Sequence, residues 1–220
     1  ENIATHISKF DKRDAISDNY IFDVFKDVNG SVWIATFTGL NRFENNLAKF
    51  ITKSIYENGS LLSINYFLEM NDGNVLIGTE SGIKVFNTND ESIRDFKTFF
   101  KSKENYFESL YIYSFYLDTD SCLWVGTRDS GLYIYDIRSD KVIDVSEELD
   151  IKKLNHAVVR EMVCDEFGNF WVATNVGLCC ISLKDNSYVF YNHDKKDKKS
   201  IPHDDIFDLM LADDVLYVTT

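Results

Sequence analysis

The chain has 220 residues, of which 45% are hydrophobic and 15% aromatic, so it can build a real core and does not have the composition of a disordered protein. Its formal net charge is −13 and it has no basic stripe with interleaved aromatic residues, which disfavours nucleic-acid binding. No run of about 18 apolar residues occurs, so we expect no membrane span. Pro202 is the only proline and no Gly-Ser linker divides the chain, so we predict a single domain over residues 1–220.

A block of similar sequence recurs along the chain. The stretch GSVWIATFTGLNRFE at Gly30–Glu44 is echoed by NVLIGTESGIKVFN, CLWVGTRDSGLYIYD and NFWVATNVGLCCIS, and the shorter VLYVTT closes the chain. The bulky residues at the position of the first tryptophan lie 43, 48, 47 and 46 residues apart; they are Trp33, Leu76, Trp124, Trp171 and Tyr217. A steady period of this length indicates a repeat architecture.

Every unit has the same parts in the same order. An alternating apolar run such as YIFDVFKD from Tyr20 is followed by a polar turn, and the block containing tryptophan comes next. A turn ending in glycine leads to a third run, and a fourth run follows, as in AKFITK, IRDFKTFF, KVIDVS and SYVFYN. Four short strands joined by tight turns predict an antiparallel meander. Helical periodicity is weak and confined to Lys101–Leu110.

A four-stranded sheet of this size cannot cover both of its faces alone, and repeated sheets solve this by stacking radially as propeller blades. We therefore predict an all-β β-propeller with four complete blades and a partial fifth. The blades are expected at about 16–54, 61–102, 108–146, 156–192 and 204–220, with a strand of a preceding or closing blade at 5–10. Because the fifth unit would leave an open sheet edge, we expect a fragment of a larger propeller.

The repeated positions have simple structural explanations. Four of the bulky residues, Trp33, Leu76, Trp124 and Trp171, should fill the space between blades. The small residues two positions later should leave room for a neighbouring backbone. The threonine that follows can bond the next turn, and the glycine after it can supply positive φ. These two sets are Thr36, Thr79, Thr127, Thr174 and Thr220, and Gly39, Gly82, Gly131 and Gly177.

Catalytic and metal sites find little support in the sequence. The acidic turns that begin at Asp27, Asp118 and Asp165 lack the spread ligands and closing glutamate of a calcium loop, so we expect hairpin turns in which the carboxylate caps the backbone. The four histidines lie in different units, and the four cysteines show no C-x-x-C pairing, so we expect no metal, no cofactor and free thiols.

A ligand site is easier to place. In a propeller with the first strand innermost, the connections that enter this strand and the turns after the threonine share one face, where recognition residues often lie. These connections are Asp11–Asn19, Tyr56–Ser63, Lys101–Leu110, Glu147–His156 and His193–Asp204. Aromatic rings can stack on sugars and arginine can bind carboxylates or sulfates, although blade packing is an alternative role for the aromatic residues. The candidate ligand-binding residues are Tyr20, Tyr66, Tyr113, Arg128, His156 and Arg160, with Tyr106 and Tyr111 beside them.

The repeated pattern I-x-x-[polar]-x-D-x-x-G-x-[LVF]-W-[IV]-[GA]-T-x-x-G-L-x-x-[YF] resembles the two-component regulator propeller repeat. The second unit departs from it at Met70 and Leu76, and the last unit at Tyr217 and Thr219. The resemblance implies a periplasmic, non-enzymatic sensor region of a bacterial hybrid two-component system. It further implies an oligosaccharide or other small-molecule ligand, a homodimer in the full-length sensor, and a histidine kinase and membrane anchor outside this chain.

Two other functions stay open at this point. Similar propellers include lyases and carbohydrate-active proteins, which would need an acid and a base converging on one face. A protein-interaction scaffold would instead show an exposed apolar patch.

Overall fold

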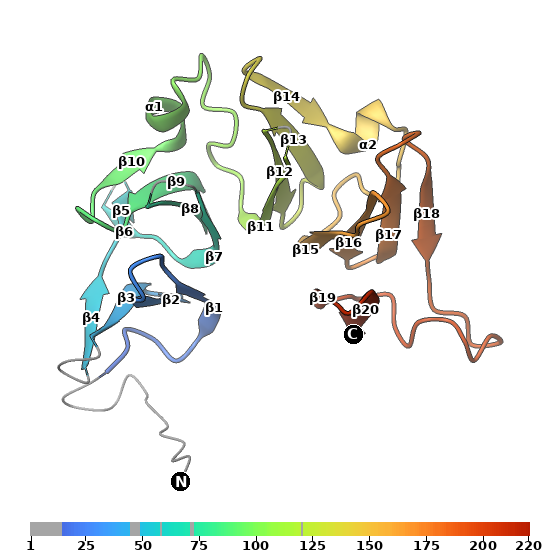
Figure 1. Cartoon of the computed structure of the whole chain (residues 1–220), viewed down its shortest axis with the longest axis horizontal. Helices are drawn as coiled ribbons and strands as arrows, with labels where there is room; N and C mark the ends of the chain where they lie inside the picture. Colours follow the sequence, from blue (N-terminus) through green and yellow to red (C-terminus); the bar gives the residue numbers. More distant parts are fainter. Residues whose placement is uncertain (1–14, 45–48, 58, 71–72, 120) are drawn as a thin grey trace, which may run out of the picture. The chain divides into compact units, whose positions relative to one another are not determined.

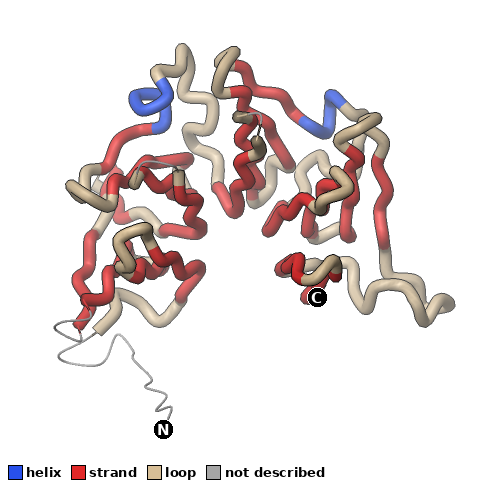
Figure 2. The backbone as a smooth tube through the Cα atoms, in the orientation of Figure 1, coloured by secondary structure: helices blue, strands red, loops and turns tan. Residues whose placement is uncertain are grey.

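The structure is a computed structural model that describes residues 15–44, 49–57, 59–70, 73–119 and 121–220. The strand expected at 5–10, His6 and the start of the first connection lie outside the described residues. Four four-stranded antiparallel sheets, each paired in chain order, make up most of the described chain (Figures 1 and 2). The predicted all-β propeller class is therefore confirmed.

Each sheet is a meander of consecutive strands. The first sheet contains β1 (Ile21–Lys26), β2 (Val32–Thr36), β3 (Gly39–Glu44) and β4 (Lys49–Lys53). The second contains β7 (Ile64–Glu69), β8 (Asn74–Thr79), β9 (Gly82–Asn87) and β10 (Ile93–Asp95). The third contains β11 (Ile112–Leu117), β12 (Cys122–Thr127), β13 (Leu132–Asp136) and β14 (Lys141–Asp144), and the fourth β15 (Val159–Cys164), β16 (Asn169–Thr174), β17 (Gly177–Ser182) and β18 (Tyr188–Tyr191).

Two small sheets complete the fold. The strands β5 (Tyr56–Glu57) and β6 (Ser60–Leu61) form a short hairpin in the connection before β7. The strands β19 (Asp208–Ala212) and β20 (Val215–Thr219) form the two-stranded start of a fifth blade. The chain divides into two compact units: one comprises the described residues up to Lys101 with Phe107–Ser109, and the other Ser102–Tyr106 with Leu110–Thr220.

In the first unit, the core lies between its two large sheets, where β1 and β2 contact β7. Trp33 is 3% exposed, and its ring meets Phe86 of the neighbouring sheet edge-on at a centroid distance of 4.8 Å. Leu40, Ile64 and Ile77 are fully buried in the same cluster. The tryptophan therefore fills the space between two blades, as predicted.

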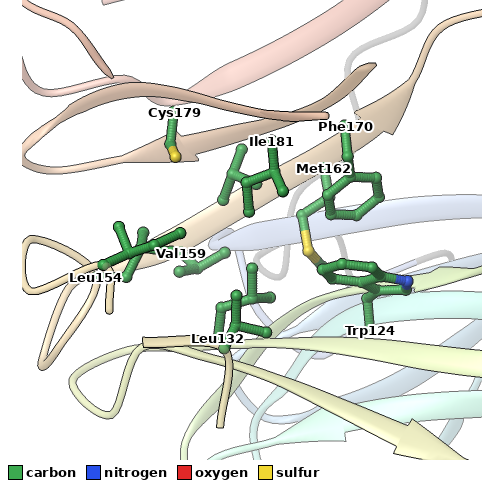
Figure 3. Close-up of a cluster of buried hydrophobic side chains, with 11 residues drawn as sticks. Trp124, Leu132, Leu154, Val159, Met162, Phe170, Cys179 and Ile181 are labelled. Atoms are coloured by element: carbon green, nitrogen blue, oxygen red, sulfur yellow. The ribbon is translucent and has the colours of Figure 1, made fainter. Parts of the chain in front are cut away.

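The second unit repeats this packing between its third and fourth sheets, where β11 and β12 contact β15. Trp124 lies against Phe170 with the ring centroids 4.1 Å apart, and the side chain of Met162 joins them (Figure 3). Trp171 packs in the same way on Leu209 of β19, but it remains half-buried.

The repeated threonines and glycines also have the predicted roles. The hydroxyls of Thr36, Thr79, Thr127 and Thr174 are buried and donate to the carbonyls of the glycines that start the next strands, at 2.8, 2.8, 2.8 and 2.5 Å. Gly131 has a φ of +76°, and a Cβ there would lie 2.4 Å from the carbonyl oxygen of Leu154. This turn therefore requires glycine for its conformation and for its close contact with the following connection.

The last repeat differs from the others. Its hairpin turns through Asp213 and Asp214, both at positive φ, and Tyr217 is 51% exposed. Tyr217, which stands at the position of the repeated tryptophans, is therefore not buried between two sheets in this structure.

The helices lie outside the predicted segment. The weak helical signal at Lys101–Leu110 was misplaced, because this segment forms turns, whereas α1 covers Phe96–Phe100 and α2 covers Val145–Glu148. In the fourth run of the second repeat, β10 therefore stops at Asp95. The rings of Phe96 and Phe100 in α1 pack together with their centroids 4.7 Å apart. Within the described part of the chain, no helix is long and apolar enough to cross a membrane.

Candidate ligand site

The first strand of every complete blade begins with a β-bulge. The pairing shifts between Ile21 and Asp23, between Ile64 and Tyr66, between Ile112 and Ser114, and between Val159 and Glu161. The residues that the register skips are Phe22, Asn65, Tyr113 and Arg160. A bulge redirects side chains, so the predicted candidates Tyr113 and Arg160 occupy equivalent positions in neighbouring blades.

The residue after the bulge joins one blade to the next. The Asp23 carboxylate accepts a hydrogen bond from the backbone N–H of Phe67 at 2.9 Å, and the Ser114 hydroxyl donates to the carbonyl of Val159 at 3.3 Å. The first bond joins β1 to β7 in the first unit, and the second joins β11 to β15 in the second unit. The residue after the bulge therefore has a structural role. The side chain of the bulged residue itself is available for a different role.

Tyr111, Tyr113 and Arg128 come together at the start of β11 and the end of β12. The Arg128 guanidinium carbon lies 5.0 Å from the centre of the Tyr111 ring, and the two tyrosine rings meet edge-on at 5.2 Å. The backbone N–H of Arg128 donates to the carbonyl of Tyr111 at 2.9 Å, which fixes the two residues side by side. We call these three residues the tyrosine–arginine cluster.

Arg128 differs from Arg42 and Arg160, which both form ion pairs. Arg42 bonds Glu91 at 2.6 Å, and Arg160 bonds Asp205 at 2.5 Å. Arg128 is exposed, and no carboxylate of the described residues forms an ion pair with it. Its guanidinium is thus stacked on a ring with donors available for an anionic group.

His156 lies next to the cluster along the following connection. It is exposed, has a φ of +60°, and its Nδ1 lies 3.3 Å from the carbonyl oxygen of Asp129. Because Asp129 directly follows Arg128, the structure brings His156 close to the predicted site.

Arg160 belongs to a separate group. Its guanidinium bonds the Asp205 carboxylate and the carbonyl of Ile206, at 2.5 and 2.9 Å, and lies 4.7 Å from the centre of the Phe207 ring. A ligand carboxylate would have to compete with Asp205 for this arginine.

The remaining two candidates, Tyr20 and Tyr66, lie in the first unit. Tyr20 is 73% exposed just before β1, and its carbonyl accepts a hydrogen bond from Phe37 at 3.2 Å. Tyr66 is half-buried and pairs with Gly78 across β7 and β8. These residues stay predicted contacts with a ligand.

The long connections contribute to the core as well as to the surface. Ile55 and Leu62, which flank the hairpin of β5 and β6, belong to the core of the first unit. Ile151 and Leu154 of the connection to β15 are fully buried in the core of the second. These segments were predicted only as recognition loops, although their apolar residues indicate a packing role as well.

The acidic turns act as predicted and make one additional contact. Asp27 accepts hydrogen bonds from the backbone N–H groups of Asn29 and Ser31 at 3.0 and 2.8 Å, and its second oxygen accepts the Trp33 indole N–H at 2.9 Å. Asp118 with Trp124, and Asp165 with Trp171, repeat this bond at 3.5 and 3.0 Å. The second repeat of the sequence, at about 61–102, lacks both partners, since Met70 and Leu76 replace them.

Asp140 anchors the segment that precedes the cluster. Its carboxylate accepts hydrogen bonds from the Ser102 hydroxyl at 2.6 Å, the Lys103 N–H at 2.9 Å and the Tyr135 hydroxyl at 3.1 Å. The bonds from Ser102 and Lys103 lower the pKa of Asp140, and burial with the Asp140 bond raises the pKa of Tyr135 to about 12. Tyr106 donates to the Asp140 carbonyl at 3.1 Å, which is a structural role for a residue predicted to lie beside the ligand.

The described histidines contact backbone groups. The Nδ1 of His193 lies 2.9 Å from the carbonyl oxygen of Ile201, and that of His203 accepts the N–H of Asp205 at 2.9 Å. Among the described residues no three His, Cys, Asp or Glu side chains are grouped so that they could hold a metal ion. The described cysteines are free, and burial raises the pKa of Cys179 to about 12, which keeps it a thiol.

Comparisons with known proteins agree with the repeat pattern. The family model "two component regulator propeller" matches residues 15–38 and 106–129, which confirms the resemblance for these two segments. No curated protein matches the chain.

Solved structures share the fold at low sequence identity. The extracellular domain of the hybrid two component system BT3049 from B. thetaiotaomicron is 20% identical with a TM-score of 0.71, covering 93% of this chain and 27% of that one. The extracellular domain of BT4673 from the same organism is 21% identical with a TM-score of 0.71, covering 96% and 29%. Virginiamycin B lyase from Staphylococcus aureus is 12% identical with a TM-score of 0.62, covering 93% and 64%. The chain thus spans less than a third of the length of the two extracellular domains.

Proposed function

We propose that the chain is part of the extracytoplasmic, periplasmic ligand-sensing region of a hybrid two-component system. The observation that carries this proposal is the tyrosine–arginine cluster, in which an exposed arginine without a carboxylate partner is held on a tyrosine ring. The similarity to extracellular domains of hybrid two component systems supports the same role.

The ligand in this proposal is a carbohydrate fragment. The Tyr113 ring offers a face or edge for the C–H groups of a sugar, and the planar Arg128 guanidinium matches a carboxylate or sulfate with two parallel hydrogen bonds. The Arg128 guanidinium already stacks on the Tyr111 ring, so less side-chain entropy is lost on binding. His156 and Asp129 would border the ligand.

Signalling in this proposal uses parts that lie outside this chain. Two sensor regions would pair as a homodimer, and a histidine kinase across the membrane would respond to a change in their arrangement. The ligand can shift this equilibrium only by its difference in affinity for the two arrangements. Within this proposal the chain itself binds without catalysis.

Calorimetric titration tests the binding step. The chain should release heat with a defined oligosaccharide from a panel that contains neutral, uronic-acid and sulfated members. The Arg128→Ala variant should bind an acidic member about tenfold more weakly, which is about 1.4 kcal/mol, and Arg128→Lys should fall between because it keeps the charge without the planar fork. Arg138→Ala, an exposed arginine on the turn after β13, serves as the control. A silent panel, or equal losses in the Arg128 and Arg138 variants, would contradict the proposal.

A lyase is the second candidate, because virginiamycin B lyase shares the fold with a TM-score of 0.62. Mass spectrometry of the same oligosaccharides, and of a cyclic peptide antibiotic, after incubation with the chain distinguishes the two functions. Turnover that scales with the protein concentration would favour the enzyme.

A further inference from the structure

The outer edge of the fourth sheet differs from the other outer edges in its protection. Exposed edge strands are usually guarded by lysines, short length or a covering helix. The strand β4 begins and ends with a lysine, and β10 and β14 lead directly into α1 and α2. The strand β18 reads Tyr-Val-Phe-Tyr, carries no charge and is followed by no helix (Figure 1).

The hydrogen-bonding groups on this edge follow from the register. The N–H of Ser182 donates to the carbonyl of Ser187, so this pair is of the hydrogen-bonded type, and such pairs alternate along an antiparallel ladder. The backbone N–H and C=O groups of Val189 therefore point towards β17 and bond Cys180. The N–H and C=O groups of Tyr188 and Phe190 point away from the sheet, where an added strand could pair with them.

A hollow lies beside the same two residues. It has a volume of ≈ 460 Å³ and is lined by Tyr188, Phe190 and the turn Asp150–Lys153. The Lys153 ammonium lies 4.9 Å from the centre of the Phe190 ring and bonds the Asn192 side chain at 2.7 Å. In a β-strand alternate side chains share a face, so an added strand would direct every second side chain towards this hollow.

The surroundings of β18 are basic, although the chain is acidic. The segment 184–199 contains five lysines and three aspartates, whereas the whole chain has a net charge of −13. The three aspartates accept backbone N–H bonds of their own turns: Asp185 from Ser187, Asp194 from Lys196 and Asp197 from Lys199. No ion pair involves these lysines among the described residues, so their ammonium groups can meet an anionic partner.

From these observations we infer that β18 is a docking edge for an extended acidic segment of a partner protein. The segment adds as a fifth strand to the sheet, with main-chain bonds to Tyr188 and Phe190. One apolar or aromatic side chain enters the hollow beside Phe190, and flanking carboxylates face the loop Lys195–Lys199. This interaction is separate from ligand binding at the tyrosine–arginine cluster and does not depend on it.

A synthetic peptide tests the docking edge. The probe is Glu-Glu-Phe-Thr-Val-Glu-Glu-amide with a fluorescent label on its N-terminal nitrogen, titrated against the full chain by fluorescence anisotropy. One twin carries lysine in place of glutamate, and another carries methyl groups on the Phe and Thr nitrogens, which interrupts the N–H row on both edges of the peptide. The probe should bind. The methylated twin should bind about tenfold more weakly, because the methylated nitrogen that faces β18 no longer donates and its methyl group obstructs strand pairing. The lysine twin should not bind.

Variants of the chain locate the contact. Tyr188→Pro removes an outward N–H without breaking the ladder to β17, and Tyr188→Thr removes the same ring but keeps the N–H. The proline variant should bind the probe about fivefold more weakly than the threonine variant. Lys198→Glu/Lys199→Glu should lower the affinity by about tenfold at low salt, and the matched pair Arg138→Glu/Lys141→Glu on the neighbouring sheet should change it little.

Several results would overturn the inference. Equal binding of the methylated twin would mean that no strand is added, and equal binding by both Tyr188 variants would place the contact elsewhere. Self-association of the chain that Tyr188→Pro abolishes, measured by sedimentation velocity, would make a second copy the occupant in place of an acidic partner. The peptide twins decide the question even where a variant fails to fold.

Discussion

The bond between Asp27 and Trp33 links a surface turn to the interblade core, and its removal allows a quantitative prediction. The carboxylate of Asp27 is buried with the indole N–H, and it accepts two backbone N–H groups as well. Asp27→Met leaves the indole N–H without an acceptor, which costs about 1–3 kcal/mol, and it also loses the turn bonds at about 0.5–1.5 kcal/mol each. We expect a total loss of about 3 kcal/mol in the free energy of unfolding.

The second repeat of the sequence, at about 61–102, shows what the chain uses when both partners are absent. It has Met70 and Leu76 at these positions, and Leu76 is fully buried. Trp33→Leu alone should cost about 2–4 kcal/mol, because it opens a void beside Phe86. In the double variant Asp27→Met/Trp33→Leu the unpaired indole no longer exists, so the loss should be about 1–2 kcal/mol smaller than the sum of the single losses.

Urea unfolding followed by circular dichroism gives these free energies for the wild type, both single variants and the double variant. The same cycle at Asp118 and Trp124 is the matched comparison, since the bond there is 3.5 Å long against 2.9 Å. Its coupling should therefore be smaller. Losses that add within about 0.5 kcal/mol at Asp27 and Trp33 would refute the reasoning.

Three further predictions concern the turn, the thiol and the threonine of the second unit. Gly131→Ala should cost several kcal/mol because it combines positive φ with a backbone clash at 2.4 Å, whereas Gly168→Ala, with a φ of +81° but only side-chain contacts at 3.7 Å or more, should cost about 1–2 kcal/mol in the same urea assay. Thr127→Val should lose about 1–2 kcal/mol with its buried bond to Gly131, and the exposed control Thr119→Val less than about 0.5 kcal/mol; equal losses would contradict the role of the hydroxyl. The raised pKa of Cys179, about 12, means that the native state holds a proton that the unfolded state releases near pH 8.5, so stability should fall as pH rises between these values. Unfolding free energies of the wild type and Cys179→Ala across this range should show a flatter profile for the variant, and parallel profiles would contradict the prediction.

Most of the fold could be predicted because its signals are local. Alternation with a period of two marks the strands, and aspartate and glycine mark the turns. The exception is the run after Arg94, which was predicted as a strand but forms α1 from Phe96 onward. Its residues Phe96, Phe99 and Phe100 have helical spacing. The bond between Asp27 and Trp33 could also have been predicted from the sequence, because the second repeat lacks both partners together.

The site was less accessible because its geometry depends on contacts far apart in sequence. Nothing local indicates that Tyr113 is the unpaired residue of a bulge, since a bulge is defined by the partner strand. Arg160 meets Asp205 from 45 residues away, which separates it from Arg128 although both were predicted as ligand contacts. The pairing of Arg128 with Tyr111 requires the hairpin of β11 and β12 to be formed.

Hydrogen exchange tests the proposed ligand site most directly. The chain is measured with and without the oligosaccharide that releases the most heat in calorimetry, and protection is followed by mass spectrometry at the peptide level. Binding at the tyrosine–arginine cluster should slow exchange at Tyr111–Tyr113 and at Arg128–Asp129, and Arg128→Ala should remove this protection. Protection confined to other segments of the chain, such as β18 and the loop after it, would contradict the account.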